Sequence, residues 1–308
     1  MTGVQTCCSS DLLKLFLQIF VDLLGEQNTD KFRKRTFTVL ELDLLRTVLD
    51  FGVHRFPEIL VKALGIKSKA DGVSISKEKG KVLAKTLANC LSKYLSQQTE
   101  AGMVATIARA IRKHVVIFGL SRQKTLKLVT ICLELWGNQD AINAKLETLL
   151  LLRDLCTFVD NNSYEKVMKK AYLTYISSCT SVTWRNYDLV SFMTNGLVEL
   201  FRCRSDISYI LVFNILQGIA GKTKGLYTAN DAEKIKKLFN WKTLNTLRFI
   251  AKAVCAMGRE APDYGQLVYP TIETLRAIAC LFPALQYIPF RLHILRLLVE
   301  LGEECNTN

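Results

Sequence analysis

The placement of prolines within residues 268–298 constrains the fold more than any other feature of this sequence. Apolar residues recur there at helical spacing, yet the stretch contains Pro270, Pro283 and Pro289. Proline disrupts the interior of a helix but is well tolerated in its first turn. The stretch therefore predicts a hairpin of two helices that each begin near a proline. Helical hairpins of this kind are the repeating units of solenoids, which favours a binding scaffold over an enzyme.

Helical periodicity extends along most of the chain, whereas strict alternation of apolar and polar residues is almost absent. One predicted apolar stripe consists of Leu285, Ile288, Leu292, Leu295 and Val299, which step by three and four residues. Because the connections are short, successive helices are expected to be antiparallel. We predict helices over 11–25, 37–52, 57–65, 76–99, 101–119, 122–137, 140–160, 164–180, 186–202, 206–220, 229–239, 241–258, 268–282 and 286–304.

Several predicted helices begin at a residue whose side chain can cap a helix. Ser121, Ser163 and Ser205 fit this role, as does Thr228 with Asp231 three residues later. The three serines also recur at a constant interval, which matches the roughly 40–47 residues of HEAT and armadillo repeats. The fold class that we predict is an all-α, HEAT/armadillo-like helical-repeat solenoid of antiparallel helix pairs.

The predicted domain organisation separates the N-terminal helices from the repeats. Residues 1–75 form helices of unassigned type, and residues 76–308 form the helical-repeat domain. The basic segment Gly65–Lys81 is predicted to be an exposed loop. Residues 286–304 form a strongly apolar helix, whereas a solenoid normally ends in a polar capping helix. We therefore expect the chain to be a fragment, truncated where another repeat would dock.

The charge of the chain points to an anionic partner. Its 41 basic and 28 acidic residues give a net charge of +13, which suits nucleic acid or an anionic membrane face. A helical protein with lysines on its solvated faces is an equally favoured explanation of the charge alone. For any single basic cluster, an ordinary solvated face is the favoured alternative. Without interleaved aromatic residues, RNA binding would depend on phosphate contacts that read no sequence. The candidate RNA-backbone contacts are Lys31, Arg33, Lys34, Arg35, Lys77, Lys79, Lys81, Arg109, Arg112 and Lys113.

Residues that carry catalysis or hold metals form no recognisable pattern. The ten cysteines include no C-x-x-C pair and read as small buried residues in a reducing compartment. None of the three histidines has a partner at metal-ligand spacing. No Walker loop, G-x-S-x-G or H-E-x-x-H motif occurs. The longest uncharged run is shorter than the about 20 residues of a membrane-spanning helix. We expect no catalytic, metal or cofactor site, no small-molecule substrate and no membrane partner.

Four blocks of the sequence resemble the nucleolar complex protein 2 family. The Ser191-Phe-Met-Thr-Asn195-Gly-Leu-Val-Glu-Leu200 block resembles that family's Phe-Met-Asn segment. The Tyr269-Pro270 start and the Pro289-Phe-Arg291-Leu-His293 helix resemble its most distinctive block. Two weaker similarities lie in Ile131–Trp136 and in Asn240–Arg248. The resemblance covers roughly residues 80–308, and it departs at Gly196, where a cysteine or similar residue is usual.

The resemblance implies a non-catalytic scaffold in the biogenesis of the large (60S) ribosomal subunit, acting in pre-ribosome maturation or nuclear export. Its partners would be a second nucleolar complex family protein, as a heterodimer, and the pre-60S particle with its precursor rRNA. The expected location is the nucleolus and nucleoplasm. Long charged tails and further C-terminal helices of the family are missing here. The alternative function is a helical-repeat adaptor in transport or signalling.

The residues singled out by the resemblance are Phe192, Met193, Asn195, Tyr269, Pro270, Pro289, Arg291 and His293. For the first three we predict helix–helix packing with one satisfied amide, and for the others hairpin geometry. Direct partner contact is the less favoured alternative. Arg291 and His293 are about 200° apart on a helix. One of them is therefore expected to face a neighbouring helix.

Overall fold

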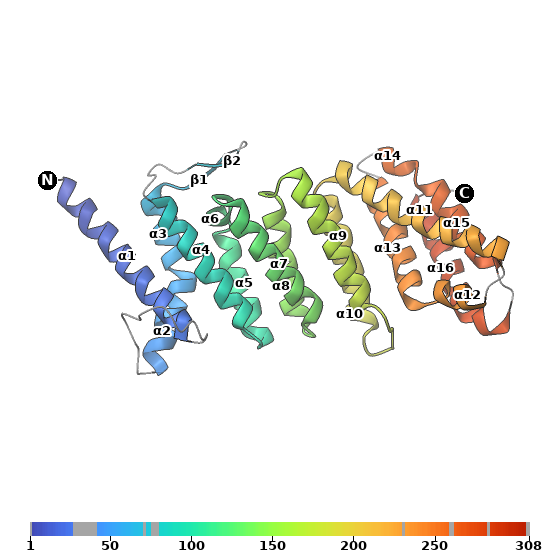
Figure 1. Cartoon of the computed structure of the whole chain (residues 1–308), viewed down its shortest axis with the longest axis horizontal. Coiled ribbons are helices and arrows are strands. Elements are labelled where there is room, and N and C mark those ends of the chain that lie inside the picture. The colour runs from blue at the N-terminus through green and yellow to red at the C-terminus, as the bar shows by residue number, and fades with distance from the viewer. Residues whose placement is uncertain are drawn as a thin grey trace. The chain divides into compact units, whose positions relative to one another are not determined.

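Helices make up nearly all of the computed structural model, which describes residues 2–26, 42–69, 72–74, 80–229, 232–258, 262–281 and 284–305 (Figure 1). The all-α prediction is therefore confirmed. The chain divides into two compact units, Met1–Val159 and Asp160–Asn308. The solenoid arrangement and the domain boundary after residue 75 stay predictions.

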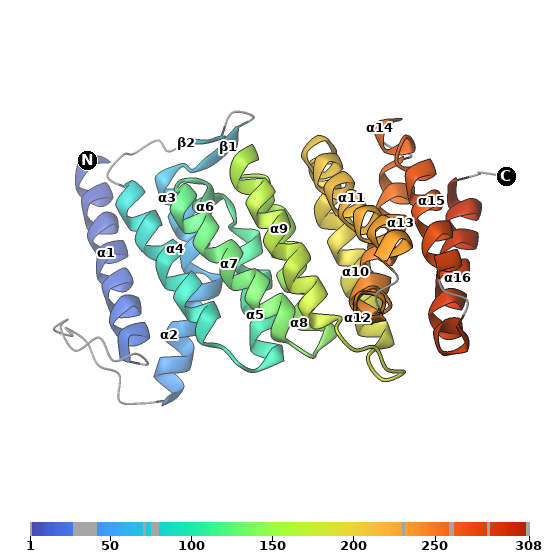
Figure 2. The same cartoon turned by 45° about the vertical axis from the view of Figure 1, so that its right-hand side comes forward.

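The first unit contains helices that pack largely on helices three elements away in chain order, as well as on their neighbours in sequence. Helix α4 contacts α1, α5 and α7, and α5 lies along α8 (Figure 2). The core includes the fully buried side chains of Phe20, Phe56, Phe118 and Trp136. The helices are α1 (Thr2–Glu26), α2 (Leu42–His54), α3 (Phe56–Leu64), α4 (Gly80–Gln97), α5 (Ala101–Lys113), α6 (Val116–Gly119), α7 (Arg122–Asn138) and α8 (Ile142–Cys156).

A short antiparallel hairpin interrupts the helices of the first unit. Strands β1 (Lys67–Lys69) and β2 (Gly72–Ser74) pair with Lys67 opposite Ser74. The prediction that Gly65–Lys81 is a loop is wrong for these strands, which are too short for alternation to be read from sequence. It is also wrong at Gly80 and Lys81, which begin α4. The rest of that segment, at residues 70–71 and 75–79, lies outside the described residues.

The second unit is built around a central buried helix, α13, which contacts α9, α10, α11, α15 and α16. Its start is fixed by Asn240, whose Oδ1 accepts from the backbone N–H of Thr243 at 2.8 Å. The elements are α9 (Asn161–Ser178), α10 (Tyr187–Arg202), α11 (Ser205–Ala229), α12 (Ala232–Leu238), α13 (Trp241–Gly258), α14 (Pro262–Gly265), α15 (Val268–Leu281), a 3₁₀ turn (Leu285–Tyr287) and α16 (Ile288–Cys305).

Three of the predicted helix caps are wrong. Ser205 is the first residue inside α11, because the carbonyl before it accepts the first helical hydrogen bond, from the backbone N–H of Ser208 at 3.1 Å. Asp160, and not Ser163, caps α9, because its carboxylate accepts from the backbone N–H of Ser163 at 3.2 Å.

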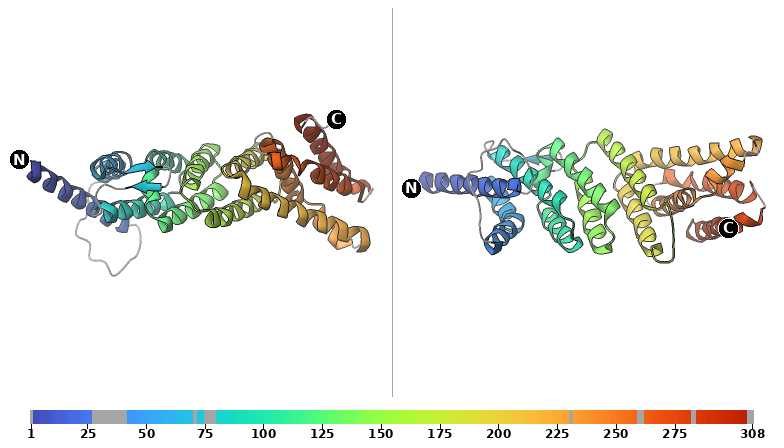
Figure 3. Two further views of the ribbon diagram at one scale, coloured as in Figure 1. Left: turned by 90° about the horizontal axis from the view of Figure 1, so that it is seen from above. Right: turned by 60° about the horizontal axis from the view of Figure 1, so that its bottom comes forward.

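The helix that was predicted to end at residue 220 continues to Ala229, so Thr228 lies inside α11 rather than at the start of a helix. Figure 3 shows α11 as one uninterrupted helix. By contrast, Ser121 does stand at the N-cap position of α7, although its side chain makes no capping bond.

Candidate functional site

The Phe192–Asn195 segment lies on α10, which packs against α13. Met193 is buried and Phe192 is half-buried. Asn195 is exposed, and its Oδ1 accepts a hydrogen bond from Lys252 Nζ of α13 at 2.8 Å. This geometry is compatible with the predicted packing role and the satisfied amide.

A buried polar network beside this segment was not predicted from the sequence. The Tyr175 hydroxyl of α9 lies 2.9 Å from Thr194 Oγ1 of α10. It donates to the backbone carbonyl of Asn245 on α13 at 3.1 Å. The Asn245 amide donates in turn to the Cys179 carbonyl at 3.1 Å. Burial raises the pKa of Tyr175, so its hydroxyl keeps its proton. The sequence signal that could have revealed this network is the polar side chains of Thr194 and Asn245 among the apolar positions of their helices.

The prolines of the second segment stand where the hairpin prediction requires them. Pro270 is in the first turn of α15 and Pro289 is in the first turn of α16. Helices α15 and α16 pack against each other, as Figure 2 shows, so the predicted hairpin is confirmed. Pro283 lies outside the described residues. Tyr269 is 72% exposed, which leaves its ring open to solvent.

His293 brings two of the family-like blocks together. Its ring centroid lies 5.7 Å from that of Trp241, the first residue of α13, at an angle of 58°. Burial lowers the pKa of His293, and the nearby charges of Arg248 and Arg296 lower it further. The ring is therefore neutral near pH 7. The prediction that one of Arg291 and His293 faces a neighbouring helix is confirmed by this contact.

The apolar stripe predicted on the last helix has the expected spacing but faces solvent. Leu285 is 82% exposed, Leu292 and Val299 are 59% exposed, and Leu295 and Ile288 are 50% and 40% exposed. The buried face of α16 is formed instead by Ile294, Leu297 and Leu301. The helix thus has two apolar faces, and periodicity alone does not show which one packs on α13 and α15.

The candidate RNA contacts differ widely in their surroundings. Lys31, Arg33, Lys34, Arg35, Lys77 and Lys79 lie outside the described residues. Lys81 and Lys113 are exposed on α4 and α5. Arg109 and Arg112 pair with the buried Glu147 of α8, at 2.8 Å from Oε1 and 3.6 Å from Oε2. These two guanidinium groups therefore hold α5 against α8, and part of their charge is neutralised.

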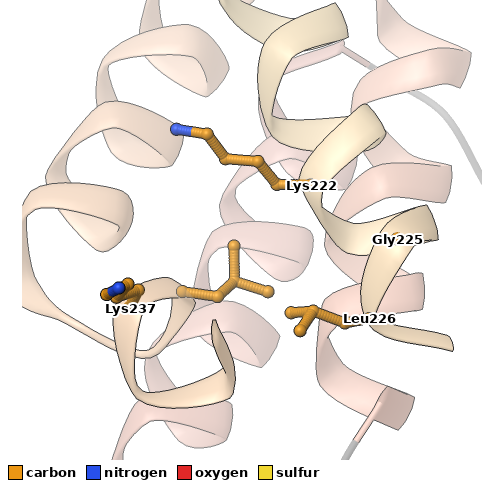
Figure 4. Close-up of a pocket in the computed structure, with 5 residues that line it drawn as sticks. Lys222, Gly225, Leu226 and Lys237 are labelled. Atoms are coloured by element: carbon orange, nitrogen blue, oxygen red, sulfur yellow. The ribbon is translucent and has the colours of Figure 1, made fainter. Parts of the chain in front are cut away.

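Two apolar cavities border α11 on one side. The first, of about 310 Å³, lies between α9 and α11 and is lined by Met168, Tyr172, Phe201, Leu211 and Ile215. The second, of about 450 Å³, lies between α11 and α12. Figure 4 shows Lys222, Gly225 and Leu226 of α11 and Lys237 of α12 around it.

The described residues contain neither a cluster of metal ligands nor a helix that could cross a membrane. Among them, no group of three or more His, Cys, Asp or Glu side chains is placed to hold a metal ion. No helix in these ranges is long and apolar enough to cross a membrane.

Comparison with known proteins agrees with the family resemblance. Residues 162–308 match the family described as the Noc2p family. "Nucleolar complex protein 2" of Drosophila melanogaster is 25% identical over 98% of this chain and 41% of its own length. "Nucleolar complex-associated protein 2" of Arabidopsis thaliana is 24% identical over 69% of this chain and 28% of its own.

A third relative, "Nucleolar complex protein 2 homolog" of Caenorhabditis elegans, is 22% identical over 95% of this chain and 41% of its own length. The chain thus spans well under half the length of these three relatives. The family match lies within the second unit, which begins at Asp160. The resemblance to the nucleolar complex protein 2 family is confirmed.

Proposed function

We propose that this chain, whose residues 162–308 match the Noc2p family, is part of a non-catalytic scaffold that assembles the large (60S) ribosomal subunit. The observation that carries the proposal is this family match, since the relatives are named as nucleolar complex proteins in an insect, a plant and a nematode. The scaffold acts in the nucleolus and nucleoplasm, during pre-ribosome maturation or nuclear export.

The positions of the family-like blocks in the second unit support a binding role. Two of them meet at the Trp241–His293 contact, and a third lies on α10 against the same central helix. These blocks build a rigid helical core in the second unit. On that core, the exposed Tyr269 is then available to touch a partner, and so is the half-buried Arg291 in part. The HEAT/armadillo-like solenoid arrangement remains part of this proposal.

The partners that we propose are a second nucleolar complex family protein, as a heterodimer, and precursor rRNA within the pre-60S particle. The net charge of +13 supports the RNA contact. Among the candidate lysines in the described residues, Lys81 and Lys113 are the exposed ones. Arg109 and Arg112 contribute less, because both are paired with Glu147.

Purification of the tagged chain from nuclei, with washes at low and moderate salt, tests this function. We expect large-subunit precursor RNA and a second nucleolar complex protein to be recovered together. Because phosphate contacts weaken steeply with salt, RNA bound by lysines should be lost first and the protein partner retained. Recovery of import receptors or signalling proteins without pre-ribosomal RNA would favour the alternative, a transport or signalling adaptor.

A further inference from the structure

We propose that the α9–α11 groove docks an acidic amphipathic helix of a protein partner. The groove is the apolar cavity of about 310 Å³ between these two helices, together with the side of α11 that continues from it. The inference rests on the proposed function, because it requires a protein partner. It adds where on this chain the partner binds and what chemistry the binding segment has.

The floor of the groove is preformed. Phe201 and Leu211 are buried there, and the Phe201 ring packs edge-on against Phe249 of α13 with centroids 5.0 Å apart. The Tyr172 hydroxyl lies 3.1 Å from Thr246 Oγ1, which holds its ring in place. Because the central helix supports the floor, a docking side chain would enter a cavity that already exists. Little conformational entropy of this chain would then be lost on binding.

Apolar side chains at the rim of the groove are largely exposed to solvent. Leu173 of α9 is 63% exposed at the edge of the cavity, and Ile210 of α11 is 58% exposed one turn before the lining residue Asn214. Large apolar side chains grouped beside an apolar cavity are typical of a protein interface. An aliphatic or aromatic anchor inserted between them would remove both from water.

The same side of α11 leads from the groove to the second cavity. Leu211, Ile215, Lys222 and Leu226 are separated by four, seven and four residues, so they share one helix face. Leu226 and Lys222 line the cavity of about 450 Å³ seen in Figure 4. From Leu211 to Leu226 this face is about 22 Å long, at about 1.5 Å per residue. It is therefore long enough for a partner helix of about four turns.

Glycines between the two cavities allow another backbone to come close. A Cβ atom added at Gly218, Gly221 or Gly225 would meet no heavy atom within 4 Å. Glycine weakens a helix interior, and at these positions it relieves no crowding within the chain. Their effect is to leave a flat track on α11 that joins the two apolar cavities. A helix lying along this track would reach both.

The charge around the groove selects the partner. Exposed lysines on α9, α11 and α12 outnumber the described carboxylates of these elements, which are Glu165, Asp206 and Glu233. Glu165 pairs with Lys169 at 2.6 Å, and Glu233 pairs with Lys237 at 4.0 Å. The remaining excess is positive and favours acidic flanks on the docked segment. The exposed lysines are Lys166, Lys169, Lys170, Lys222, Lys224, Lys236 and Lys237.

The apolar floor favours a protein helix over RNA at this place. Single-stranded RNA binds on exposed aromatic faces with a basic groove along its backbone, whereas Tyr172 is half-buried and Phe201 is buried. A phosphate chain cannot fill an apolar cavity without losing its hydration. A helix with apolar residues on one face and Asp or Glu on its flanks satisfies both the cavities and the lysines.

Carbodiimide cross-linking of the complex purified from nuclei tests the inference, because this reagent joins lysine amines directly to carboxylates in contact with them. We expect Lys166 or Lys222 to be joined to Asp or Glu residues within one amphipathic segment of a single protein. A synthetic peptide of that segment is then titrated against the purified chain. Joining to a second copy of this chain would overturn the inference, as would ultraviolet cross-linking of the same lysines to RNA.

Two variants with a matched control sharpen the titration. Leu173→Glu should weaken peptide binding about tenfold or more, whereas Val82→Glu, at a residue 69% exposed on α4, should leave it unchanged. Gly221→Leu should also weaken binding, since it fills the track, yet raise the melting temperature of the chain. Unchanged binding by both groove variants would contradict the inference.

Failure of the inference is distinguishable from failure of the proposed function. Recovery of large-subunit precursor RNA, with no cross-link from the groove lysines to a protein partner, would refute only the groove. A partner helix found in the groove, with no pre-ribosomal RNA in any fraction, would instead refute the assembly function.

Discussion

At the scale of single residues, buried polar groups connect the helices at defined points. Lys145 is 1% exposed, and its ammonium donates to the carbonyls of Trp136 at 2.5 Å and Gly137 at 3.3 Å. It thereby satisfies carbonyl groups at the end of α7 from the first turn of α8. The sequence predicted both helices, but a lysine in a basic chain gave no sign that it would be buried.

Lys145→Met should destabilise the chain by about 2 kcal/mol, because it leaves buried carbonyls without a charged donor. Urea unfolding followed by circular dichroism measures the change. The control Lys85→Met replaces an exposed lysine on α4 and should change stability by no more than about 0.5 kcal/mol. Equal effects of the two substitutions would show that the Lys145 contacts contribute nothing.

His293 should make the stability of the folded chain depend on pH. Its pKa lies below the ordinary histidine value of 6.5, because of burial first and then because of the charges of Arg248 and Arg296. The unfolded chain therefore binds the proton more strongly, and stability falls as the pH decreases from about 6.5 toward the lowered pKa. Above this window the histidine is neutral in both states and has no effect.

Unfolding titrations between about pH 7.5 and pH 5 compare the parent chain with His293→Gln. The parent should lose more stability across this range than the variant. His114, whose pKa is also lowered by burial, remains in both proteins, so some acid destabilisation should persist in the variant. Parallel profiles would mean that His293 protonates equally in the folded and unfolded chains.

At the scale of elements, most helices could be predicted, but their ends and outward faces could not. The long helix α13 was predicted with its observed bounds, because its apolar residues and leading Trp241 are unambiguous. Helix α11 was predicted to end at residue 220 but continues to Ala229, because glycine weakens a helix interior without necessarily ending it. The hairpin β1–β2 consists of three-residue strands, which leave no pattern to read.

Replacing a glycine of α11 by alanine should change the stability of the chain in the opposite direction to the same replacement in α2. Gly218→Ala should stabilise the chain by about 0.5–1 kcal/mol, since the added Cβ meets nothing and alanine favours the helix. Gly52→Ala would place its Cβ 2.4 Å from Phe20 Cε2 and should destabilise by about 1–3 kcal/mol. Thermal melts of both variants test the pair; a loss of stability in Gly218→Ala would mean that this face of α11 is already covered.

The solvent-facing stripe of α16 should tolerate polar substitution. Leu292→Ser with Leu295→Ser should leave the unfolding free energy within about 0.5 kcal/mol of the parent and improve solubility. Leu297→Ser, on the buried face, should destabilise by about 2–5 kcal/mol. Chemical denaturation distinguishes the two faces. A large loss from the first pair would place the stripe in an interface that the described residues do not account for.

At the scale of the whole molecule, the proposed function depends on the family-like blocks and on surface charge. The blocks were identified from the sequence. In the structure two of them are in contact, through the rings of Trp241 and His293. The polar network of Tyr175, Thr194 and Asn245 could not be predicted, because it joins residues from three helices. Nor could the pairing of Arg109 and Arg112 with Glu147, which depends on how α5 lies against α8.

The most direct test of the assembly role is pulse-labelling of ribosomal RNA in cells depleted of the protein. We predict a fall in newly made large-subunit RNA and an accumulation of its precursors, while newly made small-subunit RNA continues at its normal rate. Restoring the protein should reverse the defect. Equal labelling of both subunits' RNA in depleted and undepleted cells would contradict a role in large-subunit assembly.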